Sequence, residues 1–194
     1  MAQGGSPAIR TFFDEATNTV SYLVWDAATM RGAVIDPVLD WDNRSGEADT
    51  RSAAAILDAA VAEGIAVDWV LETHVHADHL SAAPWIKART GAPIGIGARV
   101  KEVQAIFRPV FDLRDITPDG GDFDRLFEDG ETFRIGTLNV EVLHTPGHTP
   151  ACAAYKVTDP QAPWKPADVF VGDTLFMHDY GTARADFPGG CART

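Results

Sequence analysis

The chain has 194 residues, of which 16 are lysine or arginine and 28 are aspartate or glutamate, so its formal net charge is −12. This acidity argues against nucleic acid and anionic membrane surfaces as partners, because both carry negative charge. Hydrophobic residues make up 45% of the chain and charged residues 23%, which are ordinary values for a globular protein. The length allows a sizeable core, and we expect a single domain over residues 1–194.

The two cysteines, Cys152 and Cys191, provide no disulfide framework, which favours a reducing compartment. The stretch from Met1 to Pro7 is polar and glycine-rich and has no signal-peptide pattern. No apolar run approaches the length that a membrane span needs. The sequence therefore predicts a soluble, cytoplasmic protein.

In chain order, hydrophobic periodicity predicts strands at both ends of the chain and helices in its middle. Period-two alternation or short apolar runs predict strands at residues 8–13, 20–25, 33–37, 67–72, 93–96, 131–135, 138–143, 151–157 and 168–172. Apolar residues at helical spacing predict helices at residues 53–64, 80–89 and 98–107. Polar or proline-rich composition predicts irregular segments at 39–49, 108–124 and 158–166, and the second of these has the character of a lid. One layered α/β domain fits this order.

The stretch Thr73-His74-Val75-His76-Ala77-Asp78-His79 follows one of the predicted strands directly. Three imidazoles and a carboxylate thus lie at the C-terminal end of a strand, where ligands gather in α/β sheets. A single histidine is usually a core or surface residue, but three of the chain's six within six positions are hard to assign to packing. Because these donors suit zinc, iron or manganese, the stretch predicts a metal site.

Two later turns offer further ligands. His148 lies in the Pro-Gly turn Thr145-Pro146-Gly147-His148, where Gly147 frees the backbone so that the ring can reach inward. Asp173 follows the apolar run 168–172, where an unpaired carboxylate would be costly to bury. A Gly-Asp turn alone is weak support, but together with the histidine stretch it completes a set of donors from three strand ends.

The order of these motifs resembles that of the metallo-β-lactamase superfamily. The resemblance implies a four-layer αββα sandwich with the metal at one edge of the two sheets. In two-metal members, the equivalents of His74, His76 and His148 hold one ion, those of Asp78 and His79 serve the second, and that of Asp173 bridges them. Relatives continue beyond this point and supply a later histidine, so we expect the chain to be C-terminally incomplete and its second metal site to be weakened.

Within that superfamily, the stretch 179–190 resembles the Gly-Arg-x-Asp-Phe region of persulfide dioxygenases. That subgroup implies one Fe(II), held by His74, His148 and Asp173, which oxidises a thiol persulfide such as glutathione persulfide to sulfite and thiol. Arg184 would then anchor a substrate carboxylate, with an exposed salt bridge as the equally weighted alternative. Ala183 and Ala185 depart from the usual glycine and the hydroxyl or thiol residue of the subgroup.

Two other functions remain open. A zinc-dependent thioester hydrolase of the glyoxalase II type would use a zinc-bound water that Asp78 orients or deprotonates. A non-catalytic relic would keep the metal ligands without a complete site. The expected partners are a small thiol or persulfide and O2, with a homodimer as the candidate assembly.

Overall fold

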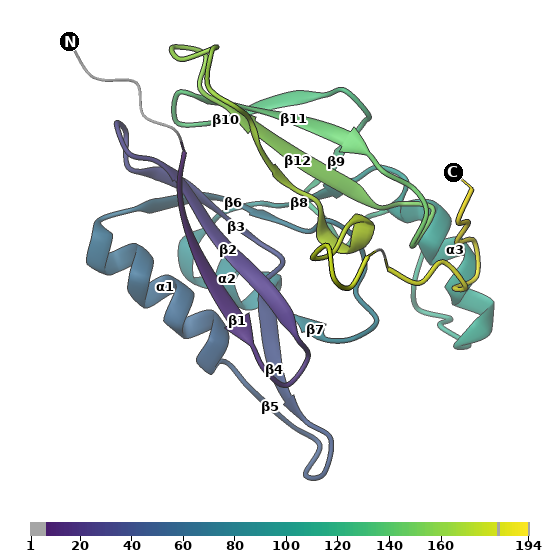
Figure 1. The fold of residues 1–194 in the computed structure, drawn as a ribbon. Helices are drawn as coiled ribbons and strands as arrows, with labels where there is room; N and C mark the ends of the chain where they lie inside the picture. The colour runs from purple at the N-terminus through teal and green to yellow at the C-terminus, as the bar shows by residue number, and fades with distance from the viewer. Residues whose placement is uncertain (1–6, 182, 194) are drawn as a thin grey trace.

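The computed structural model describes residues 7–181 and 183–193 and contains two main β-sheets that lie face to face (Figure 1). The first sheet has the strand order β1 (Ala8–Asp14), β2 (Thr19–Asp26), β3 (Arg31–Ile35), β6 (Ala66–Leu71), β8 (Ile94–Gly97) and β9 (Arg125–Phe127). The second sheet has the order β10 (Thr132–Ile135), β11 (Leu138–His144), β12 (Ala153–Thr158) and β13 (Asp168–Phe170). A small third sheet joins β5 (Glu47–Asp49), β4 (Val38–Asp42) and β7 (Leu80–Ser81).

The first sheet changes from antiparallel to parallel pairing at β3. Strands β1, β2 and β3 form an antiparallel meander, whereas β3, β6, β8 and β9 pair in parallel. Parallel neighbours need crossover connections, and these contain α1 (Arg51–Glu63), α2 (Ala83–Thr90) and α3 (Val100–Val110). Helix α1 ends at Gly64, whose left-handed backbone (φ 74°) lets its N–H reach the carbonyls of Ala60 and Val61.

Two hydrophobic cores lie on opposite faces of the first sheet. Adjacent residues of a strand point to opposite faces, so neighbours in β2, β3 and β6 enter different cores. One core packs α1 and α2 against the sheet and takes Leu23, Val34 and Val70. The other fills the space between the two sheets and takes Val24, Ile35 and Leu71. This alternation explains why all six of these side chains are buried.

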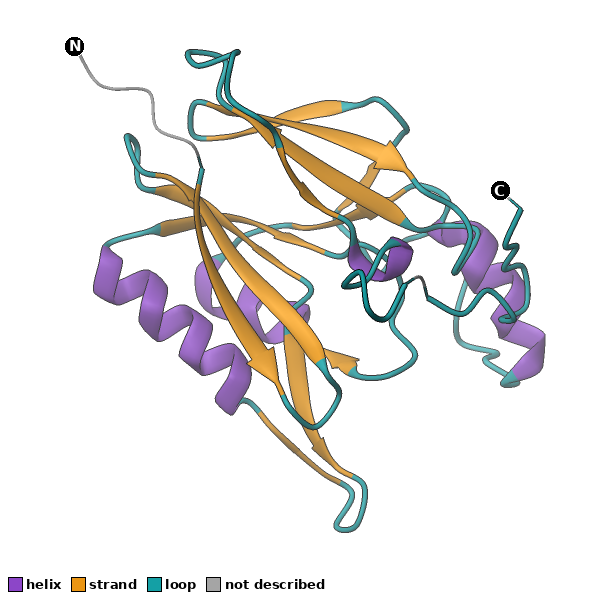
Figure 2. Cartoon of the chain, viewed as in Figure 1, coloured by secondary structure: helices purple, strands orange, loops and turns teal. Residues whose placement is uncertain are grey.

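The prediction of an α/β sandwich is confirmed, and the described residues form its α, β and β layers. Helices α1 and α2 cover the first sheet, and α3 lies at one side, next to the end of the chain (Figures 1 and 2). No described helix covers the outer face of the second sheet (Figure 2). On that face Lys156 pairs with Glu141 at 2.8 Å, and both side chains are partly exposed.

Most predicted elements are present, and the differences concern short ones. The prediction that segment 39–49 is irregular is wrong. This segment contains an antiparallel hairpin in which three residues of β4 pair with the three residues of β5. Strands β7 and β9 were not predicted, because two or three residues show no alternation. Helix α2 begins at Ala83 rather than at residue 80, since Leu80 and Ser81 pair with β4.

Residues 1–6, on which most of the expectation about a signal peptide falls, lie outside the described residues, as do Thr182 and Thr194. Within the described part of the chain, none of the helices combines the length and apolar character that crossing a membrane requires.

Candidate metal centre

The histidine- and aspartate-bearing turns meet at one end of the two sheets. His74 follows β6 in the first sheet, His148 lies in the turn between β11 and β12, and Asp173 lies in the short helix η1 (Gly172–Thr174) after β13. Two hydrogen bonds join the sheets at this end. The backbone N–H of Ala153 donates to the carbonyl of Thr73 (2.9 Å), and the hydroxyl of Tyr155 donates to the carbonyl of Glu72 (2.8 Å).

Three predicted ligands converge there. Nε2 of His74 lies 3.9 Å from Oδ2 of Asp173, and Nε2 of His148 lies 3.5 Å from the same oxygen. One donor atom of each of the three residues lies within 4.8 Å of the other two. The structure thus brings together side chains from positions 74, 148 and 173.

Hydrogen bonds determine which ring nitrogen of His74 and of His148 faces Asp173. The Thr73 hydroxyl donates its one proton to Oδ2 of Asp36 (2.8 Å), so it accepts the contact from Nδ1 of His74 (3.0 Å). Nδ1 of His148 lies 2.8 Å from the carbonyl of Arg184, which can only accept. Both rings therefore carry their proton on Nδ1, and each presents an Nε2 lone pair toward Asp173.

Burial keeps His74 in the form that a metal ion needs. Its ring is 1% exposed, and this burial, followed by the nearby His76, holds the pKa of His74 well below its ordinary value. A neutral imidazole with its proton on Nδ1 is a ligand at Nε2. That Nε2 atom is buried and has no hydrogen-bond partner among the described residues.

A second group consists of His76, Asp78 and His79, whose donor atoms also lie within 4.8 Å of one another. Nδ1 of His79 donates to the carbonyl of Leu80 (3.0 Å), which leaves Nε2 of that ring buried without a partner among the described residues. His76 has the opposite arrangement. Its Nε2 faces Asp36 at 3.1 Å, and its Nδ1 lies 4.0 Å from Asp78.

Two buried carboxylates surround Nε2 of His76. Burial alone would raise the pKa of Asp36, but His76 and the Thr73 N–H lower it below its ordinary value. For Glu72, burial prevails over the hydrogen bonds and raises the pKa. Burial alone would lower the pKa of His76, yet Asp36 and Glu72 raise it well above its usual range. His76 therefore carries a proton on the nitrogen that faces the carboxylates.

Asp173 behaves as a carboxylate that lacks a sufficient counter-charge. Burial raises its pKa, His148 lowers it, and the neighbouring Asp78 raises it further. A divalent cation would reverse this, because it stabilises the ionised carboxylate. Together with the two unpartnered Nε2 atoms, this donor set fits a metal ion.

The last described residues pack over the His148 turn. The Phe187 ring meets the His148 ring edge-on, with centroids 5.1 Å apart, and the Cys191 N–H donates to the carbonyl of Gly147 (2.8 Å). The Arg184 guanidinium, however, is paired with Asp186 at 2.6 and 2.7 Å on an exposed surface. Its backbone carbonyl, rather than its charge, touches the site. Arg184 as a substrate anchor therefore stays a prediction.

Sequence reasoning missed three residues that support the site: Asp36, Thr73 as a hydrogen-bond relay, and Glu72. The available signal was a carboxylate directly after each of the apolar strands β3 and β6. Asp36 also adopts a left-handed backbone (φ 49°), which is rare outside glycine and turns its side chain toward Thr73.

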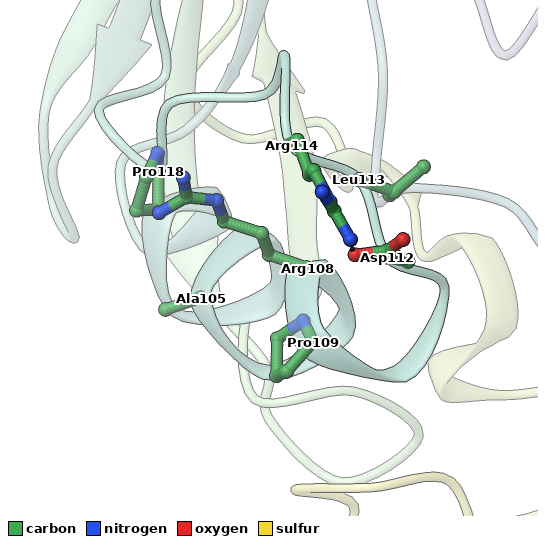
Figure 3. A pocket seen from close by; sticks show the side chains of 7 residues that line it. All are labelled: Ala105, Arg108, Pro109, Asp112, Leu113, Arg114 and Pro118. Atoms are coloured by element: carbon green, nitrogen blue, oxygen red, sulfur yellow. Dashed lines mark hydrogen bonds and ion pairs between the residues drawn. The ribbon is translucent and has the colours of Figure 1, made fainter.

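The donor residues do not line the hollow beside α3. That hollow has a volume of about 450 Å³ and is lined by Ala105, Arg108, Pro109, Asp112, Leu113, Arg114 and Pro118 (Figure 3). Arg114 pairs there with Asp112 at 2.9 Å.

Known proteins resemble this chain over most of its length. Residues 15–192 match the family described as the metallo-beta-lactamase superfamily. The chain is 51% identical over 189 residues to a "probable metallo-hydrolase" of Burkholderia pseudomallei, a match that covers 96% of this chain and 64% of that protein. It is 28% identical over 195 residues to the human mitochondrial persulfide dioxygenase, covering 99% of this chain and 62% of that one.

A crystal structure of ETHE1 from Myxococcus xanthus superposes with a TM-score of 0.69 at 28% identity, covering 95% of this chain and 64% of the other. The chain thus spans less than two thirds of the length of each of these relatives.

Proposed function

The chain belongs to the metallo-β-lactamase superfamily, and from this premise we propose that it oxidises a small thiol persulfide, such as glutathione persulfide, at a single iron(II). The observation that carries the proposal is the convergence of His74, His148 and Asp173. Two histidines and one carboxylate with open positions are the ligand set of non-haem iron oxygenases. The similarity to a human persulfide dioxygenase supports the same chemistry.

In this proposal, Nε2 of His74, Nε2 of His148 and a carboxylate oxygen of Asp173 hold the metal. When bound, iron(II) supplies the electron transfer between dioxygen and sulfur that the protein side chains cannot provide. The balanced reaction converts a persulfide RSSH, dioxygen and water into the thiol RSH, sulfite and two protons. Thr73 and the Arg184 carbonyl hold the two rings in the required tautomer.

Asp78 lies at the open side of the site. Its side chain is 46% exposed, and its Oδ2 accepts a hydrogen bond from the Thr19 hydroxyl (3.1 Å). A solvent-accessible carboxylate at this place accepts the proton that a persulfide sulfur or a water molecule loses on entering. Buried Glu72 and Asp36 cannot do so, because their oxygens face His76 and its neighbours.

The test is anaerobic loading with iron(II), followed by measurement of oxygen uptake and sulfite with glutathione persulfide. We expect wild type and His178→Ala to consume oxygen and produce sulfite in equal amounts, since His178 is exposed and outside the donor groups. His148→Ala should lose both metal and turnover. Iron-loaded wild type that consumes no oxygen above the metal-only blank would refute the proposal.

A zinc-dependent thioester hydrolase is the second candidate. The observation in its favour is the second donor group, His76, Asp78 and His79, which a two-metal hydrolase would use. The similarity to a probable metallo-hydrolase supports it as well. The zinc form would be assayed with a glutathione thioester beside the oxygen assay of the iron form. Turnover of the thioester alone favours the hydrolase, and turnover of neither substrate by metal-loaded protein favours a non-catalytic relic.

A further inference from the structure

Glu72 has an ionisable side chain that is buried, so neither hydration nor apolar packing accounts for a carboxyl group at this position. It follows β6 directly and is 3% exposed. Its Oε2 atom is buried and has no hydrogen-bond partner among the described residues. An orphaned buried carboxylate oxygen is costly, so its retention calls for a reason beyond the fold.

The other polar atoms of Glu72 form hydrogen bonds on both sides of the loop that carries His74, His76 and His79. Its Oε1 accepts a hydrogen bond from the hydroxyl of Ser81, which lies beyond the loop. Its backbone carbonyl accepts one from Tyr155 of the second sheet (2.8 Å). Ser81 also accepts the N–H of Ala83 (3.0 Å), at the start of α2. Ser81 therefore holds the carboxylate and Tyr155 holds the backbone of Glu72, and Oε2 lies 3.3 Å from Nε2 of His76.

His76 differs from the other histidines of the site in needing an acceptor at Nε2. His74, His79 and His148 each have an acceptor at Nδ1 and present Nε2. His76 presents Nδ1 toward Asp78 only if Nε2–H is held on the opposite side of the ring. Asp36 accepts there at 3.1 Å, but the same Oδ1 atom also accepts the N–H of Thr73 at 2.7 Å.

We propose that Glu72 is a positioning residue that, together with Asp36, fixes the ring of His76 so that Nδ1 is the donor turned toward Asp78 and His79. Glu72 contributes its Oε2 atom, an acceptor to which no other described group donates. Ser81, on the far side of the loop, holds the other carboxylate oxygen. It is not a metal ligand in this arrangement, because its carboxylate lies on the Nε2 side of the ring. The inference rests on metal binding by the group of His76, Asp78 and His79, but not on which reaction the site catalyses.

The experiment compares metal affinity in wild type, Glu72→Gln, Glu72→Met and Ser81→Ala by competition of zinc with a chromophoric chelator. Partners that orient a metal-binding histidine typically contribute about 10- to 100-fold in affinity. We expect the apparent Kd to rise about 10-fold in Glu72→Gln, which keeps a neutral acceptor, and about 100-fold in Glu72→Met, which removes it. Ser81→Ala keeps Oε2 and should change the Kd less than Glu72→Gln does.

Two further readouts separate positioning from a merely structural role. The visible absorption bands of the cobalt(II)-loaded protein should change in Glu72→Met, because the His76 donor is displaced. The urea midpoint of the metal-free protein should fall in Glu72→Met, because that variant removes the acceptor of the Ser81 hydroxyl and one of the two carboxylates beside His76, so the cobalt bands report the position of the His76 donor separately from stability. Unchanged zinc affinity and cobalt bands in Glu72→Met would overturn the inference, and if that variant fails to fold, the same result in Glu72→Gln would do so.

The outcomes also distinguish this inference from the proposed function. Wild type that binds zinc and cobalt but shows no oxygen uptake as the iron form contradicts only the proposed reaction. Wild type that binds no metal at all overturns the metal centre and, with it, the role of Glu72.

Discussion

The carboxylate of Asp26 accepts two hydrogen bonds from Thr137, one from its backbone N–H and one from its hydroxyl, both 2.8 Å long. Asp26 ends β2 in the first sheet, and Thr137 lies in the turn between β10 and β11 of the second. The Thr29 hydroxyl (2.8 Å) and the Ala28 N–H (2.9 Å) donate to the same carboxylate. Asp26 therefore joins the two sheets at the end opposite the metal centre.

Asp26→Ala should destabilise the protein by about 2 kcal/mol, because four donors lose a buried charged acceptor at once. Urea unfolding of the metal-free protein measures the change. Arg114→Ala is the control, since Arg114 belongs to an exposed pair with Asp112, and such pairs contribute little to stability. Equal midpoints for both variants would show that the Asp26 contacts do not stabilise the sandwich.

The Asp26 contribution should also depend on pH. Burial alone would raise the pKa of Asp26, but its hydrogen bonds with Thr137, Thr29 and Ala28 lower it below the ordinary value of 3.8. A depressed folded-state pKa gives stability that is present above the ordinary value and is lost as the pH falls through the folded value. The difference in unfolding free energy between wild type and Asp26→Ala should be constant from about pH 7 to 5 and shrink below about pH 4. A difference that grows at low pH would contradict the assignment.

Gly136 offers a test of the same junction through sterics. A Cβ at Gly136 (φ 57°) would lie 2.1 Å from the Thr29 hydroxyl oxygen and 2.6 Å from Oδ2 of Asp26. Gly130 has a similar backbone (φ 75°), but a Cβ there would meet nothing within 4 Å. Gly130→Ala should lose about 1 kcal/mol from backbone strain, and Gly136→Ala should lose about 1–3 kcal/mol more from overpacking. Equal losses of unfolding free energy in the two variants, measured with urea, would mean that the contacts around Asp26 and Thr29 rearrange to accommodate the added methyl group.

Periodicity predicted the elements that are long enough to show it. The buried alternation in β2 and the spacing from Ala53 to Ile65 locate a strand and a helix to within a few residues. Strands β5 and β9 have three residues each, so they form only because partners from elsewhere in the chain align them. The sequence of a three-residue strand does not indicate which distant segment will pair with it, so these strands were not predicted.

The candidate site divides in the same way. Histidines 74, 76 and 79 are close in sequence, so their clustering is visible without a structure. Which nitrogen each ring presents is decided by acceptors at Asp36, Leu80 and Arg184, and two of these lie more than thirty residues from the ring they hold. Donor identity was therefore predictable, whereas donor orientation required the tertiary structure.

Gly172→Ala should weaken metal binding. A Cβ at Gly172 (φ 50°) would lie 2.3 Å from the hydroxyl oxygen and 2.7 Å from Cβ of Thr73, the residue that precedes His74. The clash pushes the Asp173 turn away from His74, and misplaced ligands bind poorly. We expect at least a roughly 10-fold rise in the zinc Kd. Gly181→Ala is the control, because Gly181 also has a positive φ (88°) but open space around its Cβ. If both variants bind zinc equally well, the turn is more adaptable than the structure indicates.

Arg184 has two candidate roles, as the anchor of a substrate carboxylate or as one half of a surface salt bridge, and KM measurements distinguish them. Its guanidinium is exposed and paired with Asp186, two residues along the chain. If Arg184 anchors a substrate carboxylate, Asp186 competes for it, so Asp186→Ala should lower the KM for glutathione persulfide and Arg184→Ala should raise it. One exposed charge-assisted contact corresponds to roughly a 3- to 10-fold change in KM, with kcat nearly unchanged because the contact is the same in ground and transition states. Arg114→Ala is the matched control, since Arg114 forms the same kind of exposed pair with Asp112 in the hollow beside α3 (Figure 3). Identical KM values for Arg184→Ala and Arg114→Ala would identify the Arg184 pair as a surface salt bridge, and the substrate would then be held by other groups around the metal centre.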